Sequence, residues 1–161
     1  MGKIRASQRE LDFGVRVGAV VEKDGRVLLV RHAKPGLEPY WVLPGGRLEP
    51  RETIPECAER EVREEAGLEG RFLEVLYVSE FIREGRHTVD ITVRLAAGPG
   101  EARLGGDPED TGQQPTLQEV RWFAREELAE INLLPRTIKL RILEDVLDGG
   151  GGGGVYLGSG S

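Results

Sequence analysis

Residues 46–68 read GRLEPRETIPECAEREVREEAGL and contain a helix with clear sequence signals at both ends. Thr53-Ile54-Pro55-Glu56 has the form of a capping box, in which a proline is tolerated in the first turn. Gly67 lies where a left-handed residue is expected to end a helix. Together these signals predict a helix over residues 54–66.

The predicted helix carries carboxylates where apolar side chains are expected. At about 100° per residue, three apolar side chains share one arc of roughly 80°: Ile54, Ala58 and Val62. Glu65 falls inside this arc, Glu61 at its edge and Glu64 on its flank. Burying a carboxylate is costly unless it is paired or metal-bound, and Glu61 and Glu65 also repel each other at i,i+4. A hard divalent cation bound by oxygens from neighbouring turns would offset both costs. The alternative is a surface helix with ion pairs such as Arg60 with Glu64.

The sequence on both sides of this helix predicts a mixed sheet with few further helices. An Asp-Gly pair at 24–25 separates two runs rich in β-branched residues and predicts a hairpin. Expected strands cover 15–21, 27–32, 41–43, 72–78, 88–95 and 120–123, and further helices cover 125–131 and 136–147. Residues 98–118, rich in glycine and proline, are expected to form a long loop, which in a compact domain is often functional. Such an element order favours an α+β fold or a three-layer α/β/α sandwich.

The chain of 161 residues has the length of one domain. We assign this domain to residues 12–148, preceded by a polar arm at 1–11 and followed by a glycine-rich tail at 149–161. Six consecutive glycines open the tail and predict a flexible linker. The following Val155-Tyr156-Leu157 could dock on a sheet edge, but a tail that does not dock is preferred.

Composition restricts the compartment and the partners. The single cysteine, Cys57, excludes a disulfide framework, and a reducing compartment is the default. No apolar run approaches the roughly 20 residues of a membrane span, and the first residues lead into no apolar segment of a secretion signal. We therefore expect a cytoplasmic protein without a membrane partner. The net charge of −6 argues against duplex nucleic acid but leaves room for a small phosphorylated ligand.

The spacing of the polar residues in 46–68 resembles the Nudix box. That motif is Gly-x5-Glu-x7-Arg-Glu-U-x-Glu-Glu-x-Gly-U, with U aliphatic, and every position matches, from Gly46 through Glu52 and Arg60 to Leu68. The hairpin at 24–25, residues 41–46 and the late Glu119-x-x-Trp122-Phe123 also resemble the usual surroundings of the box. The resemblance therefore extends over about residues 12–147.

The resemblance implies a Nudix hydrolase, an α/β fold built as an α/β/α sandwich around a mixed, curved β-sheet. Family members cleave the pyrophosphate bond of a nucleoside diphosphate linked to another moiety, using water and Mg²⁺ or Mn²⁺. Carried over by position, Glu61 and Glu65 would be the principal metal ligands, and Glu64 would be a third ligand or a carboxylate that orients water. Gly46 would offer its backbone carbonyl to the metal. Arg60 would hold a glutamate of the catalytic helix in place.

Other roles are distributed more widely along the chain. By the same analogy, Glu52 would steady the loop–helix geometry. The group that removes a proton from water is either Glu64 or a distal acid, for which Glu119, Glu109 and Asp110 are candidates.

Three residues outside the acidic cluster are candidates for substrate binding. Arg31 and Arg47 could contact phosphates, although for each residue taken alone a surface arginine is the preferred interpretation. Tyr40 could stack on a base, whereas core packing is an equal alternative for its neighbour Trp41.

The substrate class follows by elimination within the family. A proline near Ile82 would mark ADP-ribose hydrolases and a tyrosine near Glu84 diadenosine polyphosphate hydrolases, and neither is present. The remaining resemblance is to the enzymes that cleave nucleoside triphosphates of the sanitising type, such as 8-oxo-dGTP. ADP-ribose or a dinucleoside polyphosphate is the alternative substrate, and a non-catalytic nucleotide-sensing domain is an alternative from another class. The partner is therefore expected to be a small nucleotide, and a homodimer is compatible with this assignment.

Overall fold

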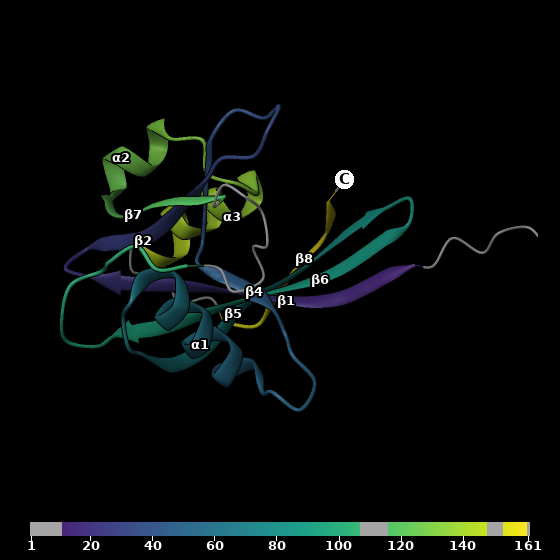
Figure 1. Ribbon diagram of the computed structural model, residues 1–161, viewed down its shortest axis with the longest axis horizontal. Helices are drawn as coiled ribbons and strands as arrows, with labels where there is room; N and C mark the ends of the chain where they lie inside the picture. Colours follow the sequence, from purple (N-terminus) through teal and green to yellow (C-terminus); the bar gives the residue numbers. More distant parts are fainter. Residues whose placement is uncertain (1–10, 107–115, 148–152, 161) are drawn as a thin grey trace, which may run out of the picture.

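A computed structural model describes residues 11–106, 116–147 and 153–160 (Figure 1). The helices and strands, in chain order, are β1 (Asp12–Lys23), β2 (Arg26–His32), β3 (Tyr40–Val42), β4 (Gly45–Arg47), α1 (Ile54–Ala66), β5 (Gly70–Arg83), β6 (Arg86–Ala97), β7 (Leu117–Ala124), α2 (Arg125–Glu130), α3 (Arg136–Arg141), a π-helical turn (Ile142–Val146) and β8 (Val155–Gly160).

The strands form one mixed sheet in the order β3-β2-β1-β6-β5-β8, with β4 also paired to β1 and β7 to β2. Strand β1 runs parallel to β6 over most of its length. Its other edge is divided, since Arg16–Gly18 pair with β4 and Glu22–Lys23 pair with β2. Helix α1 covers one face, and α2 and α3 cover the other (Figure 1). The sandwich with a mixed sheet predicted from the sequence is confirmed.

The core consists of two apolar clusters, one on each face of the sheet. Alternating side chains of β1 enter different clusters: Val17, Ala19 and Val21 pack with α1, whereas Val20 packs with the residues of α2 and α3. Helix α1 contributes four fully buried side chains to its cluster: Cys57, Ala58, Val62 and Ala66. This packing fixes the rotation of α1, and therefore the direction of every carboxylate on it.

The local signals in the sequence are confirmed at the positions where they were strongest. Thr53 and Glu56 make both hydrogen bonds of the capping box, and Gly67 ends α1 in the left-handed conformation. Asp24 and Gly25 have φ values of 52° and 70°, as a tight hairpin turn with two left-handed residues requires.

Several boundaries differ from the prediction because strand pairing extends beyond the local pattern. Strands β5 and β6 form a hairpin longer than the segments predicted at 72–78 and 88–95. A short strand, β4, occupies the expected Gly-Gly turn because its backbone pairs with β1. Strand β7 begins within the predicted 98–118 loop. Residues 107–115 of that loop, which include the candidate acids Glu109 and Asp110, lie outside the described residues.

The prediction that the C-terminal tail does not dock on the domain is wrong. Residues Val155–Gly160 form β8, which pairs in parallel with Tyr77–Phe81 of β5. Val155 and Leu157 are partly buried against the α2–α3 side of the core. Burial of these two apolar side chains favours docking of the segment, which the sequence pattern alone did not show. The arm at 1–10 and most of the glycine run lie outside the described residues, so the domain limits stay predictions.

Within the described part of the chain, no helix is both long and apolar enough to cross a membrane.

Candidate active site

Strand β4 and helix α1 meet at a close backbone approach. The Gly45 N–H donates a hydrogen bond to Glu65 Oε2 at 3.0 Å. A Cβ added to Gly46 would overlap the Glu61 carboxylate, lying 2.5 Å from its Cδ. Because β4 is itself paired with β1, these contacts tie both glutamates to the sheet. Position 46 therefore requires glycine so that the Glu61 carboxylate can lie against the backbone.

Two glutamates of α1 are buried, as the helical arc predicted. The exposed fraction of the whole residue is 7% for Glu61 and 3% for Glu65, whereas the Glu64 side chain is 29% exposed. Buried carboxylates need partners that offset the loss of hydration. The alternative of a helix whose acidic residues are simply solvated is therefore excluded for Glu61 and Glu65.

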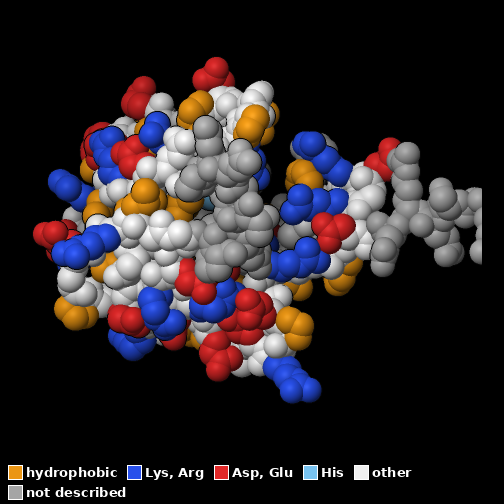
Figure 2. Space-filling model, in the orientation of Figure 1, with side chains coloured by type: hydrophobic (Ala, Val, Ile, Leu, Met, Phe, Trp, Pro, Cys, Tyr) orange, Lys and Arg blue, Asp and Glu red, His pale blue; other side chains and the backbone are white. Residues whose placement is uncertain are grey.

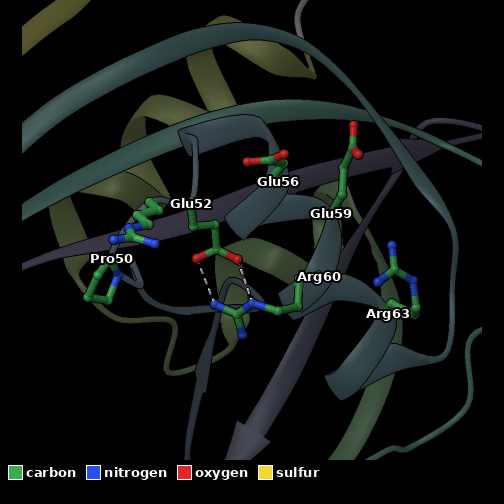
Figure 3. A pocket seen from close by; sticks show the side chains of 7 residues that line it. Pro50, Glu52, Glu56, Glu59, Arg60 and Arg63 are labelled. Atoms are coloured by element: carbon green, nitrogen blue, oxygen red, sulfur yellow. Dashed lines mark hydrogen bonds and ion pairs between the residues drawn. The ribbon is translucent and has the colours of Figure 1, made fainter.

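Arg60 is the cation at the centre of this acidic cluster. Its Nη1 lies 2.8 Å from Glu61 Oε1 and 3.1 Å from Glu64 Oε2. Its Nε and Nη2 donate to the two carboxylate oxygens of Glu52 at 2.6 and 3.1 Å. Figure 3 shows the Glu52 carboxylate and the Arg60 guanidinium facing each other. The contacts expected for Arg60 and Glu52 are present, and they link the 46–53 loop to the helix.

The same network sets the protonation of its members. Hydrogen bonding from Arg60 lowers the pKa of Glu52, against a smaller opposing effect of burial. Hydrogen bonding to Glu52 raises the pKa of Arg60, so the guanidinium stays charged. Burial, with the nearby negative charge of Glu52, raises the pKa of the Cys57 thiol to about 12. Cys57 is therefore a neutral thiol at neutral pH and not a nucleophile.

The donor set of the cluster fits a hard divalent cation. Carboxylate oxygens and a backbone carbonyl are the ligands that Mg²⁺ and Mn²⁺ prefer. The Arg60 guanidinium already places positive charge against Glu61 and Glu64. Among the described residues, no group of three or more His, Cys, Asp or Glu side chains is arranged to hold a metal ion. Arg60 bridges Glu61 and Glu64, and the Glu65 carboxylate accepts a hydrogen bond from the Gly45 N–H.

A pocket of about 400 Å³ lies on the outer side of the Glu52–Arg60 pair. It is lined by Pro50, Arg51, Glu52, Glu56, Glu59, Arg60 and Arg63 (Figure 3). In the space-filling view, acidic and basic side chains are intermixed over the region of α1 (Figure 2). The three arginines of the pocket are matched by three glutamates, so it lacks the excess positive charge that a polyphosphate requires, and we do not assign it as the substrate site.

Arg47 is engaged with β1. Its Nη2 lies 3.0 Å from Asp12 Oδ1 and donates to the Phe13 carbonyl at 2.8 Å. Its guanidinium also fills the space beside Gly14, where a Cβ would come within 2.6 Å of Nη2. These contacts fasten β4 to the first residues of β1, a structural role that competes with the predicted phosphate contact.

Arg31 and Glu119 face each other across β2 and β7, with 3.2 Å between Arg31 Nη2 and Glu119 Oε2. The Arg31 guanidinium also lies 6.0 Å from the centre of the Trp41 ring. Trp41 in turn packs edge-to-face on Phe123 of the core, which favours the packing alternative for this tryptophan. Arg31, a predicted phosphate-binding residue, and Glu119, a predicted distal acid, therefore form an ion pair with each other.

Tyr40 stacks on a histidine. Its ring lies 6.0 Å from that of His32, at an interplanar angle of 18°. The two residues are directly paired across β3 and β2. Tyr40 therefore has an aromatic neighbour within the protein, and its role as a base-stacking residue stays a prediction.

The sequence reasoning missed a contact at the C-terminal end of α1. The backbone of Arg103–Gly105, which follows β6, runs along the last turn of the helix and donates hydrogen bonds to its carbonyls. Adjacent glycines at 105 and 106 are the only local sequence signal, and they do not identify the helix as the partner.

A NUDIX domain profile matches residues 12–142, which is most of the chain. The chain therefore belongs to the NUDIX domain family, in agreement with the box at 46–68.

Two named relatives and one solved structure illustrate the relationship. The chain is 34% identical over 98 residues to ADP-ribose pyrophosphatase of Methanocaldococcus jannaschii, covering 60% of this chain and 58% of that protein. It is 35% identical over 109 residues to CTP pyrophosphohydrolase of Escherichia coli K12, covering 62% of this chain and 79% of that protein. The chain thus spans less than two thirds of the archaeal relative. The crystal structure of a NUDIX hydrolase from Nitrosomonas europaea superposes with a TM-score of 0.70 at 23% identity, covering 91% of this chain and 80% of that one, which shows the fold alone.

Proposed function

We propose that this chain hydrolyses a pyrophosphate bond in a nucleotide substrate with the aid of Mg²⁺ or Mn²⁺. Glu61, Glu64 and Glu65 would hold the metal, together with the backbone carbonyl of Gly46. The observation that carries the proposal is the burial of Glu61 and Glu65 against glycine backbone, with the Arg60 guanidinium beside Glu61. Such an arrangement is costly for stability alone and suits a site that binds positive charge.

The residues of the chain supply orientation and charge balance. When bound, a divalent ion would neutralise charge on the phosphoryl oxygens and make water a better nucleophile. Arg60, anchored on Glu52, holds the carboxylates of Glu61 and Glu64 in position. Glu64 is the most exposed of the three acids, so it can accept a proton from an attacking water. Glu119 is the second candidate for this step, and it pairs with Arg31 as Glu64 pairs with Arg60.

The preferred substrate is a nucleoside triphosphate of the sanitising type, such as 8-oxo-dGTP. The name of the E. coli relative, a CTP pyrophosphohydrolase, supports triphosphate cleavage. The name of the archaeal relative supports ADP-ribose as the second candidate, and a dinucleoside polyphosphate is the third. We further infer a cytoplasmic protein that acts on small nucleotides and not on duplex nucleic acid, and expect sedimentation to decide whether it is a homodimer.

An assay that separates the nucleotide products by chromatography tests the function, because cleavage of a pyrophosphate bond leaves a phosphate group on both products. Purified chain is incubated with 8-oxo-dGTP, CTP, ADP-ribose or diadenosine polyphosphate in Mg²⁺, in Mn²⁺ and in chelator. Glu61→Gln and Glu65→Gln are each expected to lower turnover by about 100-fold or more. Glu59→Gln is the matched control on the same helix, because an amide oxygen can still accept the Phe72 N–H at this position. Nucleotide binding without hydrolysis would support the sensing alternative, and Glu61 and Glu65 variants with nearly normal turnover would refute the site.

A further inference from the structure

The last turn of α1 is capped by a segment far away in the sequence. The final carbonyls of a helix have no partner within the helix. Here the Arg103 N–H donates to the Ala66 carbonyl at 2.8 Å, and the Gly105 N–H donates to the Glu65 carbonyl at 2.9 Å. We call Arg103–Gly105 the helix clamp. It binds the very turn that carries two of the proposed metal ligands.

Gly105 lies against the helix more closely than any side chain would permit. A Cβ built on Gly105 would overlap the carbonyl oxygen of Glu64 and lie 2.9 Å from its carbonyl carbon. Both atoms are backbone, so no change of side-chain rotamer relieves the overlap. A Cβ on the adjacent Gly106 would have no heavy atom of the described residues within 4 Å. Gly105 therefore contacts the helix, whereas Gly106 does not.

We propose that Gly105 is a positioning residue that sets where Glu64 and Glu65 lie relative to β4. This inference rests on the proposed function. Glu65 is held at two points: its carboxylate accepts from the Gly45 N–H at 3.0 Å, and its carbonyl accepts from the Gly105 N–H. One contact comes from β4 and the other from the segment after β6. The clamp thus fixes the backbone of the turn while β4 fixes the side chain, and a metal ligand needs both.

An alanine at position 105 must displace either the clamp or the last turn of α1. Substitution of groups that orient metal ligands typically lowers metal affinity by about 10- to 100-fold. We therefore expect Gly105→Ala to weaken Mn²⁺ binding by about tenfold or more. We also expect kcat to fall while KM for the nucleotide changes little, because the helix end positions the metal ligands. Gly106→Ala should match the wild type in all three measurements.

The test uses the full chain and Mn²⁺ itself as the probe. Mn²⁺ affinity is measured by electron paramagnetic resonance titration for the wild type, Gly105→Ala and Gly106→Ala, with melting curves in chelator to register folding. Weaker binding by Gly105→Ala alone supports the proposal, and equal binding by all three overturns it. A wild type that does not bind Mn²⁺ overturns the proposed metal site itself, and the inference with it.

Hydrogen exchange keeps the inference testable if Gly105→Ala does not fold. In the wild-type protein, the amides of Arg103 and Gly105 are expected to be protected to a degree similar to those at the end of α1. Exchange of these two amides at the rate of an open loop would overturn the clamp.

Discussion

Replacement of Glu52 by glutamine should destabilise the protein through the loss of one ion pair. Glu52 and Arg60 form two nearly parallel hydrogen bonds of 2.6 and 3.1 Å, and their side chains are only 11% and 21% exposed. In Glu52→Gln the amide oxygen can keep one of these bonds, whereas the amide N–H₂ would face a guanidinium N–H. A hydrogen bond to a charged group contributes about 1.5–3 kcal/mol, so we expect a loss of about 2–3 kcal/mol.

The assay is thermal unfolding at neutral pH without metal. For a domain of this size, 1 kcal/mol corresponds to roughly 2–4 °C, so Glu52→Gln should melt about 5–10 °C below the wild type. Glu69→Gln is the matched control, because Glu69 also pairs with an arginine, Arg63, but on the exposed surface. An exposed pair contributes at most about 1 kcal/mol, and the control should therefore shift little.

A second measurement follows from the position of Arg60. Without Glu52, the guanidinium is expected to bind Glu61 and Glu64 more tightly and to compete with the metal, so more Mg²⁺ should be needed for half-maximal activity. If Glu52→Gln melts within about 1 °C of the wild type, the pair does not stabilise the loop–helix junction and the reasoning is wrong.

Three further predictions concern other contacts. The pKa of Glu52 is lowered from its ordinary value of 4.5, so the Glu52 carboxylate stabilises the folded state above pH 4.5, and this contribution is lost as the pH falls through the folded-state pKa. The difference in unfolding free energy between the wild type and Glu52→Gln should therefore become smaller in acid. Gly46→Ala should displace the Glu61 carboxylate and lower turnover by about 100-fold, and normal kinetics would contradict the close approach. Tyr156→Phe should raise the pKa of Glu80, which the tyrosine hydroxyl lowers by a 2.7 Å hydrogen bond; carbon-detected NMR titration measures it, and an unchanged pKa would exclude the contact.

Much of helix α1 could be predicted because its determinants are local. Thr53, Glu56 and Gly67 act within a few residues of the chain, and helical periodicity alone places Glu65 among apolar side chains. The hairpin at Asp24-Gly25 was predictable for the same reason, since the turn geometry selects these residue types.

The contacts that were missed all join distant segments. Pairing of Gly45–Arg47 with β1, and of Gly105 with the end of α1, depends on backbone groups that every residue carries and that leave no pattern in the sequence. The Arg31–Glu119 pair likewise arises from the register of β2 and β7, which no local rule supplies. Residue type can predict which groups are available for chemistry, whereas the partner of each group depends on the topology.

Strand β8 also determines how the protein tolerates shortening. By occupying the margin of β5 from Tyr77 to Phe81, it satisfies backbone groups that would otherwise be open to strands of other molecules. Removal of residues from Val155 onward would uncover that row and invite intermolecular pairing and precipitation at high concentration. A chain that ends before Val155 is therefore expected to aggregate more readily than the full chain.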